Sequence, residues 1–269
     1  MRIAVIVTTY NRPDALAAVL EGYFAQDAHD FEVIVADDGS TVETRELVED
    51  RARRAPFPLL HVWQEDRGFR AGAARNRALA ATGAHYIVFS DGDCVPPAEF
   101  VSRHRALAEP GYFVAGNRML LSEGFTGRVL KEHIPIHRWR HGQWIAAWAR
   151  GDVNRLLPLL ALPDGAFRKR APQRWEGVKT CNLGAWRADL VRVNGFDESY
   201  SGWGLEDSDL VVRLTHAGIR HKSARFAAPV FHLWHQEWDR GPLAENRRQL
   251  DELLASTRVE ARLGLREYR

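Results

Sequence analysis

The chain has 269 residues, 45% of them hydrophobic and 27% charged, which is enough apolar material for a sizeable core and excludes fibrous and disordered proteins. The 37 lysine and arginine residues nearly balance the 35 aspartate and glutamate residues, for a formal net charge of +2, so we expect no nucleic-acid partner. No apolar stretch approaches the roughly 20 residues that span a bilayer, so we expect no transmembrane segment.

The first 93 residues alternate short apolar runs with amphipathic segments. This alternation predicts strands at residues 3–7, 31–36, 59–63 and 86–90, and helices that begin at Pro13 and that span 42–54 and 71–81. Strand, helix and strand in this order indicate an α/β protein with a mostly parallel sheet flanked by helices. Ligands of such sheets bind at the carboxyl ends of the strands, so the segments that follow the strands are candidate site residues.

Beyond Asp93 this alternation stops. Residues 122–175 are rich in aromatic, basic and proline residues and predict a helical insertion without strands, including a helix over 144–157. Further predicted elements are a strand over 177–184, a helix over 206–215, a strand over 226–235, a helix over 242–254 and then an arginine-rich tail. Eight of the nine tryptophans follow residue 138, so we expect the two halves of the chain to do different things.

The two cysteines, Cys94 and Cys181, lie far apart and form no cysteine-dense framework. The N-terminus starts with a strand-like run and lacks the charged and apolar regions of a secretory signal. These features predict a cytoplasmic protein with free thiols, in which any membrane contact is peripheral.

Arginine is far more frequent than lysine, since only four of the 37 basic residues are lysines. Arginine is the residue better suited to forked contacts with phosphate or carboxylate. Within residues 67–76, which open a predicted helix with small residues, Arg70 and Arg75 suit an anion held at the helix start. A solvated basic helix face explains the same run equally well.

Two acidic motifs follow predicted strands. Asp91-Gly92-Asp93 places two carboxylates one residue apart, an arrangement that binds a divalent cation together with a diphosphate. Asp37-Asp38-Gly39-Ser40 offers a carboxylate to a nucleobase N–H or a ribose hydroxyl. Each motif alone also fits a solvated turn, so both interpretations stay open at this point.

Two further motifs lie in the second half. Trp203-Gly204-Leu205-Glu206-Asp207-Ser208-Asp209 puts three acids in the first turn of a helix, where the helix dipole stabilises them. One of these acids is also suited to accept a proton from an attacking hydroxyl, with Trp203 stacking on a sugar face. His232 and His235 are three residues apart and suit one metal ion, although paired histidines are more often structural.

Taken together, these motifs resemble a family-two inverting glycosyltransferase of the GT-A (Rossmann-like) fold, over nearly the whole chain. The second half resembles the C-terminal module of β-1,4-galactosyltransferases and of bacterial chondroitin-type polymerases. The motifs that carry the resemblance, in chain order, are residues 8–13, 37–40, 69–76, 91–93, 179–184, 195–197 and 202–207.

The resemblance implies a role for individual residues. Asp207 matches the catalytic base, and Glu206 beside it is implied to touch acceptor or donor hydroxyls. Asp93 and His235 are implied metal ligands, and His232 stands where the galactosyltransferase pattern carries a different ligand. The implied acceptor-binding residues are Trp203 and Asn182, and the implied nucleotide-binding residues are Thr8, Tyr10, Arg12, Asp38, Arg70, Arg75 and Asp91.

The implied reaction is the inverting transfer of a hexose-type sugar from a nucleotide donor, expected to be UDP-linked, to a hydroxyl of a saccharide or glycolipid acceptor, with Mn²⁺ or Mg²⁺ as cofactor. A place in bacterial surface polysaccharide or lipopolysaccharide synthesis follows from the same resemblance. The single domain is expected to divide into a nucleotide-sugar half (1–120), a helical insertion rich in tryptophan and arginine (121–176), an acceptor and catalytic half (177–255) and a basic tail (256–269).

The insertion leaves three interpretations open for Trp139, Trp144 and Trp148. They bind a saccharide, lie at the inner face of a membrane, or form the core of the insertion. Two other classes of protein also stay open. One is a sugar-1-phosphate nucleotidyltransferase, although no glycine-rich loop follows the first strand, and the other is a non-catalytic carbohydrate-binding protein on a transferase fold.

Overall fold

The computed structural model describes residues 1–236 and 243–268. Its strands are β1 (Ile3–Thr9), β2 (Phe31–Asp37), β3 (Leu59–Trp63), β4 (Tyr86–Asp91), β5 (Cys94–Val95), β6 (Tyr112–Ala115), β7 (Asn117–Leu120), β8 (Asn182–Trp186), β9 (Arg220–Ser223) and β10 (Pro229–His232). Its helices are α1 (Pro13–Phe24), α2 (Val42–Ala52), α3 (Ala71–Ala80), α4 (Phe100–Leu107), α5 (Glu123–Lys131), α6 (His141–Ala149), α7 (Arg187–Arg192), α8 (Glu206–His216) and α9 (Leu243–Leu254). Short 3-10 turns are η1 (Ile136–Arg138), η2 (Leu157–Leu159), η3 (Ala166–Lys169) and η4 (Leu265–Tyr268).

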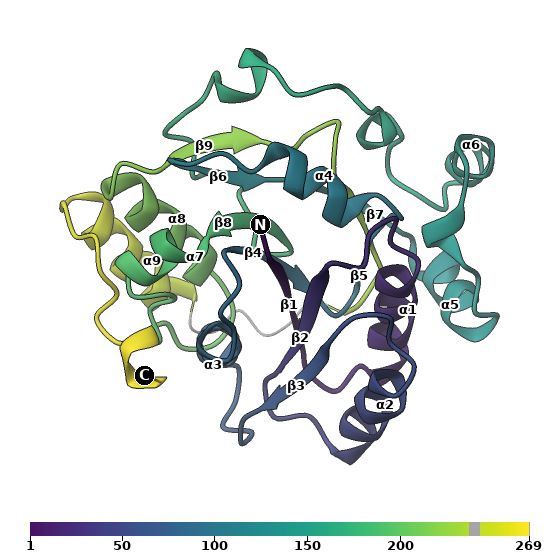
Figure 1. The fold of residues 1–269 in the computed structure, drawn as a ribbon, viewed down its shortest axis with the longest axis horizontal. Coiled ribbons are helices and arrows are strands. Elements are labelled where there is room, and N and C mark those ends of the chain that lie inside the picture. Colours follow the sequence, from purple (N-terminus) through teal and green to yellow (C-terminus); the bar gives the residue numbers. More distant parts are fainter. Residues whose placement is uncertain (237–242, 269) are drawn as a thin grey trace.

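Within the described residues, seven strands form the central sheet in the order β3-β2-β1-β4-β8-β6-β9 (Figure 1). The first four strands in this order are parallel to one another, β8 runs antiparallel to both its neighbours, and β9 is parallel to β6. The predicted mostly parallel sheet is therefore confirmed. Its register pairs Thr9 with Asp37 and Thr8 with Asp91, so the carboxyl ends of β1, β2 and β4 meet at one edge.

Strand β1 shows why helices cover both faces of this sheet. Successive side chains of a strand point to opposite faces. Accordingly Val5 and Val7 belong to the core that α1 and α4 cover, whereas Ala4 and Ile6 belong to the core that α3 and α8 cover. All four side chains are fully buried. A strand that is covered on both faces of the sheet must be apolar at every position, as the run Ile3 to Val7 is.

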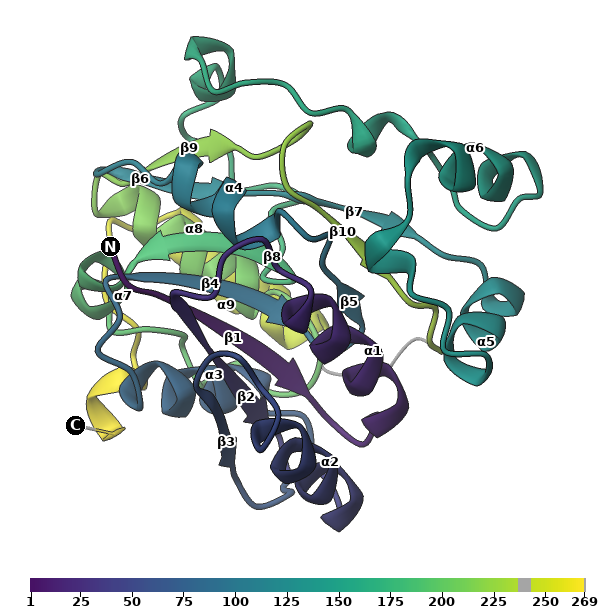
Figure 2. The ribbon, with the colours of Figure 1, turned by 45° about the vertical axis from the view of Figure 1, so that its right-hand side comes forward.

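A second, smaller sheet of the order β5-β10-β7 lies beside the end of the main sheet (Figure 2). Strand β10 is antiparallel to β5 and parallel to β7, and its register pairs His232 with Cys94. Because β5 follows Asp93 directly, this pairing brings His232 close to the acidic motif Asp91-Gly92-Asp93. Helices α5 and α6 lie beyond β7, at one end of the molecule (Figure 2).

The tryptophans of the insertion divide between core and surface. Trp144 is fully buried and packs against Trp139 and against Phe231 of β10. Trp148, one turn further along α6, is 52% exposed, and Ile145 of the same helix is 54% exposed. The core interpretation therefore holds for Trp144 but not for Trp148.

Several predicted element bounds are wrong. The helix expected over 144–157 ends at Ala149, because Gly151 takes a left-handed conformation with φ of +77°. The strand expected over 177–184 begins only at Asn182, and the strand-like run 226–235 forms only the four residues of β10. The last helix begins at Leu243 in the described part of the chain, and Pro242 and Trp238 lie outside that part.

Three short strands were not predicted from the sequence, and the packing of the C-terminal segment on the protein was not predicted either. Strands β5, β6 and β7 have only two to four residues, too few for a periodic pattern, and β5 and β7 pair with a partner more than 100 positions away. The predicted basic tail packs on the protein: Leu265 is buried, and Arg258 forms ion pairs with Asp197 and Asp209.

No helix among residues 1–236 and 243–268 is long and apolar enough to cross a membrane.

Candidate active site

A cleft of about 580 Å³ opens where β1, β2 and β4 end. The opposite wall comes from the start of α8, from the segment before β8 and from the end of β10. The predicted site residues that line the cleft are Thr8, Tyr10, Arg12, Asp38, Arg75, Asp91, Asp93, Trp203, Glu206, Asp207, His232 and His235. Residues from both halves of the chain thus face one cavity.

The turn Asp91-Gly92-Asp93 is held tightly against β1. Gly92 donates its backbone N–H to the Thr8 carbonyl over 2.7 Å. A Cβ atom at Gly92 would lie only 2.9 Å from Thr9 Oγ1, so a glycine is required for this close approach. The turn therefore fixes both carboxylates at the rim of the cleft, one on each side of the glycine.

Arg75, from α3, connects the acidic groups of the two halves. Its guanidinium donates to Thr8 Oγ1 over 2.9 Å, to Asp91 Oδ1 over 3.1 Å and to Glu206 Oε1 over 3.3 Å. Asp207 Oδ1 lies 3.7 Å from the same guanidinium, and the Arg75 side chain is only 5% exposed. Burial alone would lower the pKa of Arg75, but the charges of Asp91, Asp207 and Glu206 outweigh it and raise that pKa. Arg75 is therefore a permanent buried cation.

Two of these carboxyl groups have raised pKa values. Burial raises the pKa of Asp91 to about 6, against the opposing effect of Arg75 and with a further rise caused by Asp93. Burial, reinforced by the charge of Asp207, raises the pKa of Glu206 to about 7, and Arg75 opposes this rise too. Glu206 Oε2 is buried without a hydrogen-bond partner in the described chain, so this oxygen is available to a ligand hydroxyl.

Asp207 lies in the first turn of α8 and is oriented by Thr180. The Thr180 hydroxyl donates to Asp207 Oδ1 over 2.7 Å, and the Thr180 backbone N–H donates to Oδ2 over 3.2 Å. Leu205, the residue before the helix, has φ of +76°, a left-handed conformation that costs a non-glycine residue about 1–2 kcal/mol. This sharp turn points the N-terminus of α8, whose dipole favours acidic side chains, into the cleft.

Asp93 faces the two histidines of the second sheet. Its Oδ2 atom lies 3.3 Å from His235 Nε2 and 3.8 Å from His232 Nε2. Burial lowers the pKa of His232, so its ring is neutral and suited to a metal, although the charge of Asp93 partly opposes this shift. A carboxylate with two imidazole nitrogens at the rim of the cleft is a donor set that fits a divalent cation.

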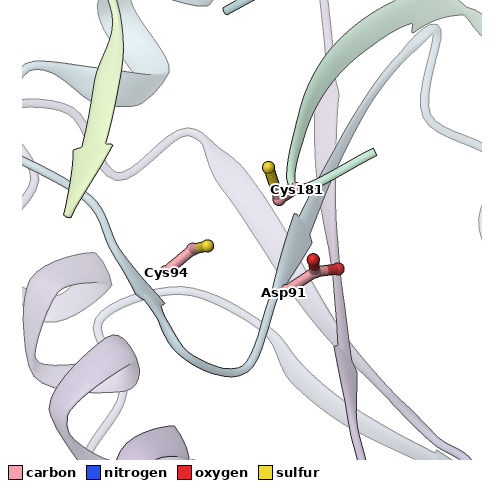
Figure 3. A group of neighbouring side chains, drawn as sticks. All are labelled: Asp91, Cys94 and Cys181. Atoms are coloured by element: carbon pink, nitrogen blue, oxygen red, sulfur yellow. The ribbon is translucent and has the colours of Figure 1, made fainter. Parts of the chain in front are cut away.

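A second group of possible ligands lies deeper. Cys94, Cys181 and Asp91 place one ligand atom each within 4.8 Å of one another (Figure 3), and Asp93, Cys94 and His232 do the same. Both cysteines are buried free thiols, and burial raises the pKa of Cys94 well above its usual range. Hard cations such as Mn²⁺ and Mg²⁺ bind thiols poorly, so Asp93 with the two histidines, which contains no thiol, is the better candidate set.

Asp37 and Asp38, at the end of β2, have different partners. Asp37 accepts the backbone N–H of Ser40 over 2.7 Å, which is the predicted turn, and pairs with His61 over 2.8 Å. Asp38 instead faces the cleft, where it accepts from Gln64 Nε2 over 2.6 Å and from the Arg70 backbone N–H over 2.7 Å. Burial raises the pKa of Asp38, and these two donors oppose the rise.

The other predicted nucleotide-binding residues have partners of their own. Tyr10 donates its hydroxyl to Asp66 over 2.9 Å, and Arg12 forms an ion pair with Asp14 at the same distance. Arg70 does not line the cleft; its guanidinium donates to the Glu65 carbonyl over 2.6 Å. Arg70 therefore reaches the cleft only through its backbone N–H on Asp38.

Asn182, the predicted acceptor-binding residue, also lies away from the cleft. It is 1% exposed in the sheet, and its amide donates to the carbonyls of Ala228 and Asn117. Its Oδ1 atom lies 3.0 Å from His104 Nε2. Because these contacts join β8 to β6–β7 and to the segment before β10, Asn182 holds the two sheets together.

Four further residues belong to the site but were not predicted from the sequence: Thr180, Gln64, Lys179 and Arg118, of which all but Gln64 line the cleft. Thr180 and Lys179 stand inside the motif 179–184, so their position was a usable signal. Gln64 follows β3 directly, at the same edge of the sheet as the acidic motifs. Arg118 lies in the unforeseen strand β7 and had no such signal.

Comparisons with known proteins divide the chain into two matched segments. Residues 4–159 match the family model described as glycosyl transferase family 2. Residues 166–236 match the family model described as N-terminal domain of galactosyltransferase. The first segment contains Asp91-Gly92-Asp93 and Arg75, and the second contains Asp207, His232 and His235.

Among curated proteins, the validoxylamine A glucosyltransferase of Streptomyces hygroscopicus subsp. limoneus is 34% identical over 230 residues, covering 81% of this chain and 48% of that protein. The chondroitin synthase of Escherichia coli is 26% identical over 246 residues, covering 87% of this chain and 34% of that protein. The chain thus spans about half the length, or less, of these curated relatives.

Two solved structures have a similar fold. S. aureus TarS 1–349 in complex with UDP-GlcNAc matches with a TM-score of 0.58 and 17% identity, covering 100% of this chain and 69% of that one. The mannosyltransferase PcManGT from Pyrobaculum calidifontis, in complex with GDP-Man and Mn²⁺, matches with a TM-score of 0.61 and 22% identity, covering 94% and 63%.

Proposed function

Because the chain belongs to glycosyl transferase family 2, we propose that it transfers a hexose-type sugar from a UDP-linked donor to a hydroxyl of a saccharide acceptor, with inversion at the anomeric carbon. The family match over more than half of the chain confirms the resemblance seen in the motifs, and the fold is of the GT-A type. One observation carries the proposal: the buried cation Arg75 joins the acids of both halves in the cleft that Asp93 and the histidines also line.

Asp207 is proposed as the base. Its carboxylate faces the cleft and is oriented by Thr180, so it can take the proton of an acceptor hydroxyl. The hydroxyl oxygen then bonds to the anomeric carbon as the bond from that carbon to the diphosphate oxygen breaks, and the nucleoside diphosphate leaves. Attack from the face opposite the leaving group inverts the configuration. The unpartnered Oε2 of Glu206 is proposed to accept a hydrogen bond from a sugar hydroxyl.

Asp93, His235 and His232 are proposed to hold the divalent cation, Mn²⁺ or Mg²⁺. Their oxygen and imidazole donors fit such an ion, and the structurally similar PcManGT was solved with Mn²⁺. When bound, the cation stabilises the negative charge that develops on the leaving diphosphate. Asp91 beside it is proposed to contact the donor while Arg75 balances its charge.

The nucleotide is proposed to lie along the ends of β1 and β2. Asp38 presents its carboxylate there, and Tyr10 offers a ring to pack against uracil. Thr8 and Arg12 line the same wall, and Arg70 contributes by positioning Asp38 through its backbone. Trp203 lines the other side of the cleft and is proposed to stack on a sugar face.

A peripheral membrane contact is proposed for the exposed side of α6. Ile145 and Trp148 present apolar surface there, and residues 121–176 contain ten arginines and lysines against five acidic residues. Apolar side chains among basic residues are typical of surfaces that bind anionic lipid. Since Cys94 and Cys181 are free thiols, a reducing cytoplasmic setting at the inner face of the membrane is part of this proposal.

The test is release of nucleotide from a panel of UDP-sugars, with and without Mn²⁺, in the presence of saccharide acceptors. Glycosyl transfer predicts UDP together with a heavier saccharide whose linkage is inverted. A nucleotidyltransferase would instead consume a sugar 1-phosphate and a nucleoside triphosphate with release of pyrophosphate, and a binding protein would release nothing. Either of these results would refute the proposal.

A further inference from the structure

A second pocket opens beside the active-site cleft. It has a volume of about 240 Å³ and lies where the parallel strands β6 and β9 end. In the sheet these two strands lie on the far side of β8 from β1 to β4 (Figure 1). Arg118, Lys179 and Cys181 line both cavities, so the pocket adjoins the cleft. They meet at the segment that carries Thr180, the residue that orients Asp207.

The charged side chains that line this pocket are all cationic. Five basic side chains face it, and no aspartate or glutamate does: Arg118, Arg155, Arg174, Lys179 and Arg225. Within the part of the chain that the structure describes, no carboxylate oxygen lies within 4.0 Å of any of these five groups. Some arginines elsewhere do pair with acids: Arg213 and Arg258, for example, both contact Asp209.

Two of these cations, both on exposed positions, donate to backbone carbonyls. Arg155 Nη2 donates to the Arg118 carbonyl over 2.9 Å, and Arg174 Nε donates to the Glu176 carbonyl over 3.2 Å. His221 also lines the pocket; burial lowers its pKa, as do the charges of Arg174 and Arg225, and its hydrogen bond to the Ala171 carbonyl opposes this shift. Guanidinium groups that line one pocket with no carboxylate oxygen of the described chain within 4.0 Å are suited to bind a carboxylate or a phosphate in a bidentate way.

We propose that this pocket binds an anionic group of the acceptor, so that the acceptor is a saccharide that carries carboxylates or phosphates. The inference rests on the proposed glycosyl transfer and names the substrate class of the same site. The pocket reaches the cleft on the side of Lys179 and Asp207, whereas the proposed nucleotide wall is at Asp38. The anion it holds is therefore part of the acceptor and not of the donor.

The test is calorimetric binding of matched oligomers in the absence of any donor. The probes are a neutral tetrasaccharide (cellotetraose), a uronic-acid tetrasaccharide (tetragalacturonate) and a phosphate monoester of cellotetraose. An anionic probe is expected to bind about tenfold or more tightly than cellotetraose, since hydrogen bonds to charged groups are the stronger ones. Which anionic probe binds distinguishes a carboxylated from a phosphorylated acceptor.

Variants show whether the anionic probe binds in this pocket. The double variant Arg174→Ala/Arg225→Ala is expected to lose about tenfold or more of the affinity for the anionic probe. Arg170→Ala, an exposed arginine of the same segment that does not line the pocket, is the matched control and is expected to bind as the unaltered chain does. Equal affinity for neutral and anionic probes, no binding of any probe, or equal loss in the control would overturn the inference.

A fall in UDP affinity in the double variant, with binding of the anionic probe intact, would also overturn it by assigning the pocket to the donor. Because these measurements contain no donor, they are independent of the nucleotide-release assay. Failure of that assay with intact binding of the anionic probe would count against the proposed reaction and not against the anion pocket.

Discussion

Arg75 Nη1 lies 3.3 Å from Glu206 Oε1, although 131 sequence positions separate the two residues. The same guanidinium reaches Asp91 at the end of β4 and Thr8 in β1. Strands β1 and β4 and the helix that carries the proposed base are therefore connected through one buried cation. Loss of this cation is expected to affect the fold before it affects any single step of catalysis.

Arg75→Met is expected to lower the free energy of unfolding by about 3–5 kcal/mol, because it leaves Asp91 and Glu206 buried without their counter-charge. The measurement is urea unfolding followed by circular dichroism. Arg67→Met removes an exposed arginine that pairs with Glu65 and is expected to cost about 1 kcal/mol or less. Similar losses in both variants would contradict the role assigned to Arg75.

Asp207→Asn is expected to lower turnover by about 10²–10⁴-fold, because the amide cannot take the proton of the acceptor hydroxyl. Affinity for the nucleotide-sugar should stay unchanged, and calorimetric titration with the donor checks this. Asp251→Asn, on the exposed side of α9, is the control and should turn over normally. A normal rate in Asp207→Asn would remove this residue from the base role.

Excess chelator is expected to abolish activity, and added Mn²⁺ is expected to restore it, since Asp93 and the histidines are proposed to hold the cation. Asp93→Ala should behave like the chelated enzyme and should not recover with Mn²⁺. Asp50→Ala, which removes a carboxylate of α2 outside the cleft, should respond to Mn²⁺ as the unaltered chain does. Full activity in excess chelator would refute the metal assignment.

Stability is expected to depend on pH through Glu206. Its pKa is about 7 in the folded protein against an ordinary value of 4.5, so folding takes up a proton between these values and the folded state loses stability as pH rises through this range. The contribution is at most about 1.4 kcal/mol per pH unit. Urea unfolding at pH 4.5 to 7 should give a shallower slope for Glu206→Gln. Parallel curves for the two proteins would contradict the raised pKa.

Ile145→Glu/Trp148→Glu is expected to reduce co-sedimentation with phosphatidylglycerol vesicles by about tenfold or more, because both side chains supply apolar surface on α6. Leu263→Glu, a 44% exposed leucine in the C-terminal segment, should leave sedimentation unchanged. Phosphatidylcholine vesicles should bind less of the unaltered chain, since the insertion is basic. Absence of sedimentation with either lipid would refute the membrane contact.

Local patterns in the sequence were sufficient for the first half of the fold. β1 to β4 and the helices between them were predicted within a few residues, because apolar runs and helical periodicity are properties of neighbouring positions. The acidic motifs were predicted to lie at one edge because parallel strands end together. The short strands β5 and β7 escaped this reasoning, since their pairing with β10 depends on residues more than 100 positions away.

For the site, the sequence by itself determined which residue types stand at the ends of the strands and which family they resemble. It did not determine their partners. That Arg75 neutralises acids from both halves, that Thr180 orients Asp207, and that Asn182 is buried between sheets follow from contacts between distant segments.

The partners of the arginines, too, depend on contacts between distant segments. The sequence showed that arginine was in excess, but only the tertiary structure decided that five basic side chains gather without a carboxylate in one pocket of the described chain, while Arg75 and Arg213 are buried against acids. The physical reason is that hydrophobic periodicity is encoded in adjacent positions, whereas the pairing of a charge depends on how separate segments pack.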